Sequence, residues 1–168
     1  MQQKTQRLLI GAGVLVGALL LTRRPKNDPD SVLDALTNML LAETDFARDK
    51  QEMAQILFVA LNRAKQHSSS VVDIVTPPGK PTWNSGATYR ERFNSAEQSS
   101  RWAAARVFVQ QVLTGAYGNQ GYTSFLHPSG MPTPPCSGAL VSSQTAAGAR
   151  CLPSWAIGGR VVGGAMFV

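Results

Sequence analysis

The spacing of apolar residues predicts an amphipathic helix from about Ser31 to Glu43. Val32, Leu36 and Met39 recur at positions i, i+4 and i+7, and Glu43 continues the same stripe at i+11. The glutamate therefore falls on the core-facing side, at the C-terminal end of the helix. A carboxyl group placed there loses part of its water and meets the negative end of the helix dipole, and both effects favour its protonated form. The alternative is a carboxylate that reaches past the helix end into solvent.

Two further helices are expected downstream. Residues 51–66 have the clearest helical spacing in the chain, carried by six apolar residues: Met53, Ile56, Leu57, Ala60, Leu61 and Ala64. A third apolar stripe begins near Ser95 and ends at Gly115, a residue type that commonly terminates helices. The segment 80–94 has turn residues and aromatics without a clear period, which is typical of a surface loop.

The C-terminal part of the chain has a different pattern, rich in glycine and proline with only short apolar alternations. Residues 122–127 alternate and end at Pro128, and residues 158–168 place apolar pairs around Gly163 and Gly164, as in a hairpin or a final strand. The expected fold is therefore mainly α, of the α+β kind, with a helical core and a short β-hairpin or strand region. A length of 168 residues suits one ordinary domain.

The positive charge of the chain is concentrated at its N-terminus. The formal net charge is +6, from sixteen Lys and Arg residues against ten Asp and Glu. Five of the basic residues precede Asn27 and all ten acidic residues follow it, so the rest of the chain is nearly neutral. Its basic residues are scattered, without the basic stripe and interleaved aromatics of a nucleic-acid groove. We therefore expect no nucleic-acid partner.

The N-terminus is expected to form a membrane anchor. Residues 8–21 are fourteen apolar or small residues with basic residues on both sides. The run is short for a spanning helix, which needs about 20 residues. A signal-peptide core of about 7–15 residues is the alternative, although no small-residue cleavage site follows. A GxxxG step at Gly13 and Gly17 would allow weak self-association. The expected organisation is an anchor over residues 1–24, a linker over 25–30 and a main domain over 31–168.

Cys136 and Cys151 are the only cysteines. They bracket fourteen residues rich in Ser, Gly, Ala and Thr, which suits a disulfide that closes a loop with little core of its own. From loop entropy, such a bond stabilises the domain by about 3 kcal/mol, and it requires an oxidising compartment. Two free thiols in a reducing compartment are the alternative. The sequence has no CxxC pair or His/Cys cluster that suggests a metal site, and no cofactor is expected.

Five short motifs occur along the chain in a fixed order. They are Leu40–Glu43, Ile56–Arg63, Val71–Val75 with Pro78–Gly79, Val112–Gly115 with Tyr122–Pro128, and Pro153–Trp155 with Val162–Phe167. Together they resemble the SleB-type cell-wall hydrolases, a family that includes spore-cortex-lytic enzymes and has a lysozyme-like fold. The resemblance extends from about Leu33 to Phe167. The chain departs from the family pattern after Glu43, where a small Gly-containing loop is missing, and at His127, where the family has an Asn before Pro.

The family resemblance implies that Glu43 is the catalytic residue of an enzyme that cuts the MurNAc–GlcNAc bond of peptidoglycan. In lytic transglycosylases, one glutamate protonates the glycosidic oxygen and then assists the sugar's own C6 hydroxyl, which leaves a 1,6-anhydro product. No second protein carboxylate is needed. The alternative, a hydrolytic muramidase, needs a second carboxylate at about 5–9.5 Å, and the candidates are Asp45, Asp49, Asp73 and Glu91.

The resemblance also implies residues around a sugar cleft. Four substrate-binding residues are expected at its edge: Tyr122, Thr123, Ser124 and Phe125. The hydroxyl group of Thr123 or Ser124 would bond an N-acetyl group or orient the catalytic acid, and an ordinary strand with alternating faces is the alternative. Trp83 could stack on a sugar ring or simply fix its loop to the domain. Asn62 and Arg63 are expected to support the active side of the core, or to form only a salt bridge or a cap.

The expected substrate, together with the anchor and the cysteine pair, suggests where the protein acts. Its partners would be peptidoglycan glycan strands and the membrane lipid around residues 8–21. Two settings fit: a bacterial inner membrane with the domain in the periplasm, or the membrane of a bacteriophage virion. Two other classes stay open, namely a non-catalytic peptidoglycan-binding or structural membrane protein, and a helical interaction domain unrelated to cell walls.

Overall fold

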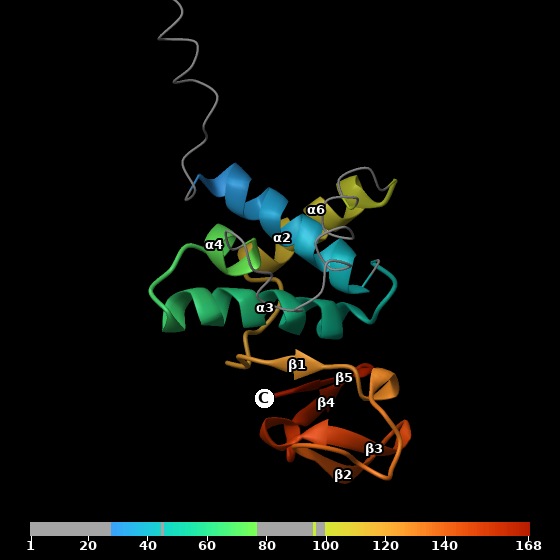
Figure 1. The fold of residues 1–168 in the computed structure, drawn as a ribbon. Helices are drawn as coiled ribbons and strands as arrows, with labels where there is room; N and C mark the ends of the chain where they lie inside the picture. Colours follow the sequence, from blue (N-terminus) through green and yellow to red (C-terminus); the bar gives the residue numbers. More distant parts are fainter. Residues whose placement is uncertain (1–27, 45, 77–95, 97–99) are drawn as a thin grey trace, which may run out of the picture.

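The structure of this protein is a computed structural model that describes residues 28–44, 46–76, 96 and 100–168. The expected anchor, residues 8–21, lies outside these ranges. Within them, no helix is long and apolar enough to cross a membrane. The described chain is mixed α+β, as the sequence predicts, with helices gathered at one end and short strands at the other (Figure 1).

The helices and strands follow one another in two blocks. The helices are α2 (Pro29–Thr44), α3 (Lys50–Gln66), α4 (Val71–Val75) and α6 (Trp102–Leu113). The strands are β1 (Phe125–Leu126), β2 (Leu140–Thr145), β3 (Gly148–Pro153), β4 (Arg160–Val162) and β5 (Ala165–Phe167), with short 3-10 turns η1 (Pro128–Gly130) and η2 (Ser154–Ala156). In Figure 1, α3 lies between the other helices and β1, so it is the helix that meets the strand block.

Helix α2 carries the apolar stripe that the sequence predicts. Leu36 and Met39 are fully buried, and they belong to the main apolar cluster of the domain. The helix begins at Pro29, about two residues earlier than expected. Proline suits this position because its missing N–H would have no partner in the first turn and its φ angle is already helical.

Helix α3 begins at Lys50, one residue before the predicted start. The Asp49 side chain caps it, because its Oδ1 accepts hydrogen bonds from the backbone N–H groups of Gln51 at 2.8 Å and Glu52 at 3.2 Å. The cap fixes the direction in which the chain enters α3.

Helix α6 begins at Trp102, whereas the sequence predicts a start near Ser95. A turn at residues 100–101 precedes the helix. The indole N–H of Trp102 donates to Asn38 Oδ1 on α2 at 2.8 Å. This bond holds the first turn of α6 against α2, and Ala96, inside the predicted range, is also helical.

The predicted C-terminal hairpin is confirmed. Strands β4 and β5 pair antiparallel, and β5 also pairs with β1, which gives the strand order β1–β5–β4. Phe167 on β5 is fully buried and belongs to the same apolar cluster as the helices. Phe125 stacks on it with ring centroids 5.9 Å apart. Phe167 therefore joins the sheet to the helical block.

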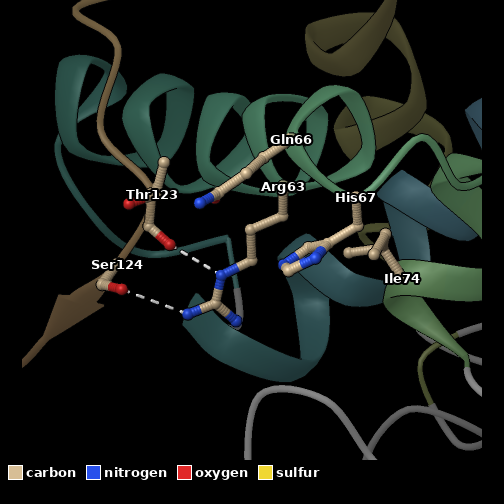
Figure 2. Close-up of a pocket in the computed structure, with 6 residues that line it drawn as sticks. All are labelled: Arg63, Gln66, His67, Ile74, Thr123 and Ser124. Carbon is tan, nitrogen blue, oxygen red and sulfur yellow. Dashed lines mark hydrogen bonds between the residues drawn. The ribbon is translucent and has the colours of Figure 1, made fainter.

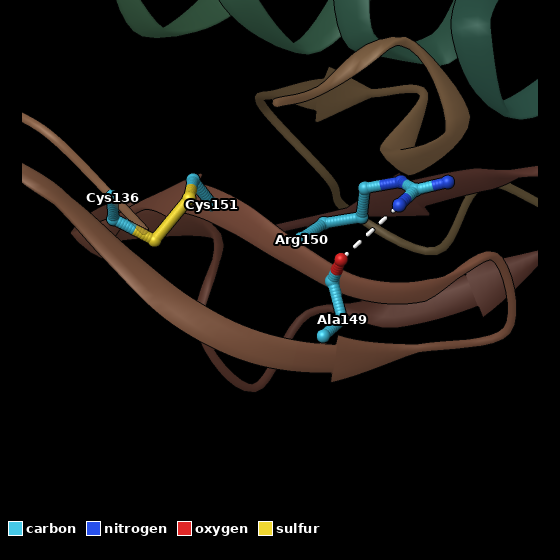
Figure 3. Close-up of a disulfide and its surroundings, with 4 residues drawn as sticks. All are labelled: Cys136, Ala149, Arg150 and Cys151. Atoms are coloured by element: carbon cyan, nitrogen blue, oxygen red, sulfur yellow. Dashed lines mark hydrogen bonds between the residues drawn. A yellow bond between two sulfur atoms is a disulfide. The ribbon is translucent and has the colours of Figure 1, made fainter. Parts of the chain in front are cut away.

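The segment between the two cysteines is a hairpin, and the expectation of a loop was wrong. Strands β2 and β3 pair over six residues each, and Thr145 faces Gly148 across a two-residue turn. The sequence hides these strands because Ser, Gln, Thr and Ala residues give no apolar alternation, and β2 has no fully buried residue. The predicted disulfide between Cys136 and Cys151 is present, and Cys151 on β3 is fully buried (Figure 3).

Removing this disulfide is expected to lower the free energy of unfolding by about 3 kcal/mol, because the unfolded chain regains the entropy of an open loop. The variant is Cys136→Ala with Cys151→Ala, and urea unfolding with and without a reductant measures the effect. The reductant should bring the wild type to the stability of the double variant and leave the variant unchanged. Equal stability under all four conditions would contradict the prediction.

Candidate functional site

Glu43 lies in the last turn of α2, where the helix ends abruptly. Its neighbours Ala42 and Thr44 are buried, and Glu43 itself is half-buried. The Thr44 hydroxyl donates to Leu40 O at 2.7 Å and accepts from the backbone N–H of Phe46 at 3.1 Å. This pair of bonds ends the helix and turns the chain toward α3. The glutamate is thus held at the corner between the two helices, where its side chain keeps partial access to solvent.

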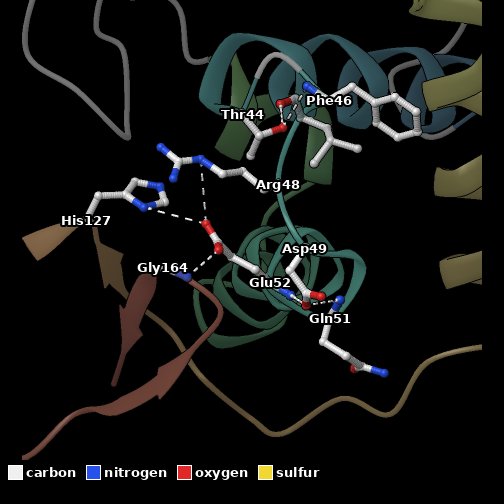
Figure 4. A network of polar contacts seen from close by, with 9 residues as sticks. Thr44, Phe46, Arg48, Asp49, Gln51, Glu52, His127 and Gly164 are labelled. Atoms are coloured by element: carbon white, nitrogen blue, oxygen red, sulfur yellow. Dashed lines mark hydrogen bonds and ion pairs between the residues drawn. The ribbon is translucent and has the colours of Figure 1, made fainter. Parts of the chain in front are cut away.

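A second carboxylate near this corner is much more buried than Glu43. Only 2% of the Glu52 side chain is exposed, in the first turn of α3 (Figure 4). Its Oε2 accepts the backbone N–H of Gly164 at 2.6 Å. Its Oε1 lies 3.9 Å from Arg48 Nε and 3.6 Å from His127 Nδ1. The Glu52 carboxylate is therefore contacted from three parts of the chain. These are the connection before α3, the residue after β1 and the turn between β4 and β5.

The sequence analysis missed Glu52, which is buried more deeply than Glu43. Glu52, Ile56 and Val59 stand at positions i, i+4 and i+7, the same spacing that singled out Glu43. The apolar repeat that begins at Met53 obscures this signal. No contact in the structure tests whether Glu43 is catalytic, so that assignment stays a prediction.

The groups around Glu52 also affect the pKa and the tautomer of His127. Burial lowers the pKa of the His127 imidazole; the Glu52 carboxylate opposes this effect and Arg48 adds to it. The imidazole is therefore neutral at pH 7, and the carboxylate oxygen beside Nδ1 favours the tautomer that carries its proton on Nδ1. Glu52 Oε1 and both His127 nitrogens are covered, yet they have no hydrogen-bond partner among the described residues.

Asn62 and Arg63 lie at the opposite end of α3 and tie it to the chain that leads into β1. The Asn62 amide donates to Tyr122 O at 2.7 Å, and Arg63 Nε donates to Thr123 O at 2.6 Å. Arg63 Nη2 also donates to Ser124 Oγ at 3.2 Å (Figure 2). Burial lowers the pKa of the Arg63 guanidinium, which still stays charged at physiological pH. Both side chains thus hold the C-terminal part of α3 to the segment before β1, and a role on the active side of the core stays a prediction.

A hollow of about 340 Å³ opens beside Arg63 (Figure 2). Its described lining residues are Arg63, Gln66, His67, Ile74, Thr123 and Ser124. Glu52 and Arg63 are eleven residues apart on one helix, which is about 16 Å along its axis. The predicted catalytic corner and this hollow therefore belong to different ends of α3.

Two of the expected cleft residues are partly buried among aromatic neighbours. The Tyr122 ring lies against Phe167 with centroids 5.3 Å apart, and its hydroxyl donates to Gln120 Oε1 at 2.9 Å. Phe125 stacks on Phe167 from β1. These contacts anchor the sheet, but only Phe125 belongs to a strand, and a sugar-binding role for either ring stays a prediction. Trp83 lies outside the described residues.

Two of the four candidates for a second catalytic carboxylate lie within the described residues, and both have structural roles. Asp49 caps α3, and Asp73 accepts from the Ser70 hydroxyl at 2.8 Å at the start of α4. Asp45 and Glu91 lie outside the described residues. In the described ranges, no group of three or more His, Cys, Asp or Glu side chains could hold a metal ion.

No protein-family model, no curated protein and no solved structure matches the chain.

Proposed function

We propose that this protein is a peptidoglycan-cleaving glycosidase that acts as a lytic transglycosylase, with Glu43 as its single acid and base. The observation that carries the proposal is the position of Glu43: a half-buried carboxyl group in the last turn of α2, at a corner fixed by the Thr44 hydroxyl. Partial burial and the helix C-terminus both favour a carboxylic acid that can give up a proton to a leaving group. The family resemblance of the surrounding motifs supports the same assignment.

The reaction needs two proton transfers at this one carboxyl group. Glu43 first donates its proton to the glycosidic oxygen while the bond from that oxygen to C1 of MurNAc breaks. The resulting carboxylate then accepts the proton of the C6 hydroxyl as O6 attacks C1 and closes the 1,6-anhydro ring. Since the nucleophile belongs to the substrate, its effective concentration is high and no water needs to be positioned.

The state of the other described carboxylates supports a mechanism with one carboxylate. A hydrolytic muramidase would use a second carboxylate as base or nucleophile. Asp49 and Asp73 serve at helix starts, and Glu52 is enclosed by Gly164, Arg48 and His127. The described acidic residues near the corner therefore already have structural roles.

The overall arrangement is compatible with the lysozyme-like fold that the resemblance implies. A helical block carries the proposed acid at the end of its first described helix, and a small antiparallel sheet packs beside α3. The disulfide between Cys136 and Cys151 suits an oxidising compartment. The proposed location is a bacterial periplasm, with the protein anchored to the inner membrane, or the membrane of a bacteriophage virion.

Digestion of peptidoglycan sacculi tests the proposal. The full-length chain, held in detergent micelles, is incubated with purified sacculi, and the soluble products are separated and weighed by mass spectrometry. We expect 1,6-anhydro-muropeptides. Products with reducing MurNAc ends would instead identify a muramidase. A folded protein that sediments with sacculi without releasing products would be a binding or structural protein, and the proposed activity would be wrong.

A further inference from the structure

A buried acid–base cluster lies where the sheet meets α3, and the proposed reaction does not use it. Glu52 comes from the first turn of α3, and its hydrogen-bond partner Gly164 lies 112 residues further along the chain, in the turn between β4 and β5. His127 follows β1 directly, and Arg48 precedes α3. Figure 4 shows the carboxylate between the imidazole, the guanidinium and this turn.

The turn between β4 and β5 is fitted closely over the carboxylate. Gly163 has a φ angle of +59°, a conformation that favours glycine. A Cβ atom at this position would collide with Glu52 Oε2, so the turn can approach the acid only without a side chain. The backbone N–H of Gly164 then reaches the carboxylate at 2.6 Å, within the range of a strong charge-assisted bond.

We infer that Glu52 and His127 form a clamp that holds the β1–β5–β4 sheet against the start of α3, and that this clamp loosens in acid. The charged groups that face the cluster in the described structure are Arg48 and Glu52, with His127 as the group that changes charge near neutrality. Gly164 donates its backbone N–H to Glu52, and a backbone hydrogen bond of Gly164 also opposes the lowering of the His127 pKa. With a neutral imidazole, the buried carboxylate is balanced by one guanidinium, whose side chain is 42% exposed.

Acid opens the clamp because the closed state resists protonation of His127. Burial is the main reason why the pKa of this imidazole is lowered below 6.5. When the sheet moves away, the ring returns to water and takes up a proton at its ordinary pKa of about 6.5. Below that pH the open state therefore binds more protons than the closed state, and falling pH shifts the equilibrium toward opening. Well above pH 6.5 the ring is neutral in both states, so the clamp holds fully.

The clamp would position the proposed acid. Arg48 belongs to the short connection between the end of α2, which carries Glu43, and the start of α3. Fixing the sheet on Glu52 therefore also fixes this corner. This consequence for catalysis rests on the proposed function, whereas the clamp itself does not. Glu52 and His127 are accordingly positioning residues, and no contact with substrate is assigned to them.

Thermal unfolding at pH 7.5 and pH 5.0 tests the clamp with the full-length chain. The variant is His127→Gln, and His67→Gln is the matched control because it removes the other histidine, which is exposed. The wild type and the control should lose about 2–4 °C more in melting temperature between the two pH values than His127→Gln does. An equal loss in all three proteins would overturn the inference.

Amide exchange in the wild type separates local opening from general destabilisation and needs no variant. The protection factor of the Gly164 amide should fall at least several-fold from pH 7.5 to pH 5.0, while that of Val59 in the core of α3 stays the same. An unchanged Gly164 protection factor, or parallel losses at both sites, would overturn the inference. Both tests are independent of sacculus cleavage, so a failed digestion would refute the proposed function and leave the clamp to be judged by these results.

Discussion

Replacing Glu43 by glutamine should reduce the release of muropeptides from sacculi by about 10²–10⁴-fold, the range expected when a general acid is lost. Glutamine matches the shape of glutamate but cannot give a proton to the glycosidic oxygen or accept one from the C6 hydroxyl. Sedimentation with sacculi should be retained, because only the proton transfers are removed. The initial rate of product release, quantified by mass spectrometry, measures the effect.

The control for this variant is Asp28→Asn. Asp28 precedes α2, so the control makes the same change of charge at the opposite end of the same helix. Its rate of release should match the wild type, and both variants should keep the wild-type melting temperature to within a few degrees. A Glu43→Gln protein that releases products at the wild-type rate would remove Glu43 from the mechanism.

Replacing Phe167 by alanine should lower the free energy of unfolding by about 3–5 kcal/mol. The side chain is fully buried, packs against the rings of Tyr122 and Phe125, and belongs to the apolar cluster of the helices. Its removal leaves a cavity at the junction of the two blocks. Urea unfolding measures the loss, and a single transition that moves as a whole is expected because the largest apolar cluster includes residues of both blocks.

Val168→Ala is the matched control for Phe167→Ala. The Val168 side chain is 41% exposed, while its backbone exchanges hydrogen bonds with Ser124 that alanine would keep. The change in stability should stay within about 0.5 kcal/mol. If Phe167→Ala were as mild as this control, or if only the strand block unfolded early, the sheet would not share the helical core.

The elements with regular apolar spacing were predictable from the sequence. The stripe on α2 and the repeat in α3 place buried residues at helical intervals, so both helices are found within two residues of their observed ends. The hairpin of β4 and β5 is marked by apolar pairs around Gly163. The pairing of the disulfide follows because the chain has only two cysteines. In each case the prediction depends either on the spacing of nearby residues or on a pairing that has only one possible partner.

The parts that were missed depend on contacts between distant residues. Strands β2 and β3 are held by the pairing of their backbones. Their Ser, Thr and Ala residues give no apolar alternation from which this pairing could be predicted. The role of Glu52 becomes visible only when Gly164 and His127 are brought beside it. The expected cleft residues Thr123 and Ser124 turned out to lie at the Arg63 end of α3, because spacing along the sequence does not reveal which end of a helix a later segment meets.

The hairpin of β2 and β3 offers a place to add foreign sequence. In sequence, the hairpin falls between β1 and β4, two strands of the β1–β5–β4 sheet. It forms a separate two-stranded sheet and adds no strand to the other one. Its base is held by the fully buried Cys151 and Leu152, while Ala146 at its tip is exposed. Lengthening a surface loop costs only about 0.6 kcal/mol for each doubling of its length. An epitope or a protease recognition sequence at Ala146 would therefore be tolerated, and it would test the proposed membrane anchoring by showing from which face of a sealed membrane the domain can be reached.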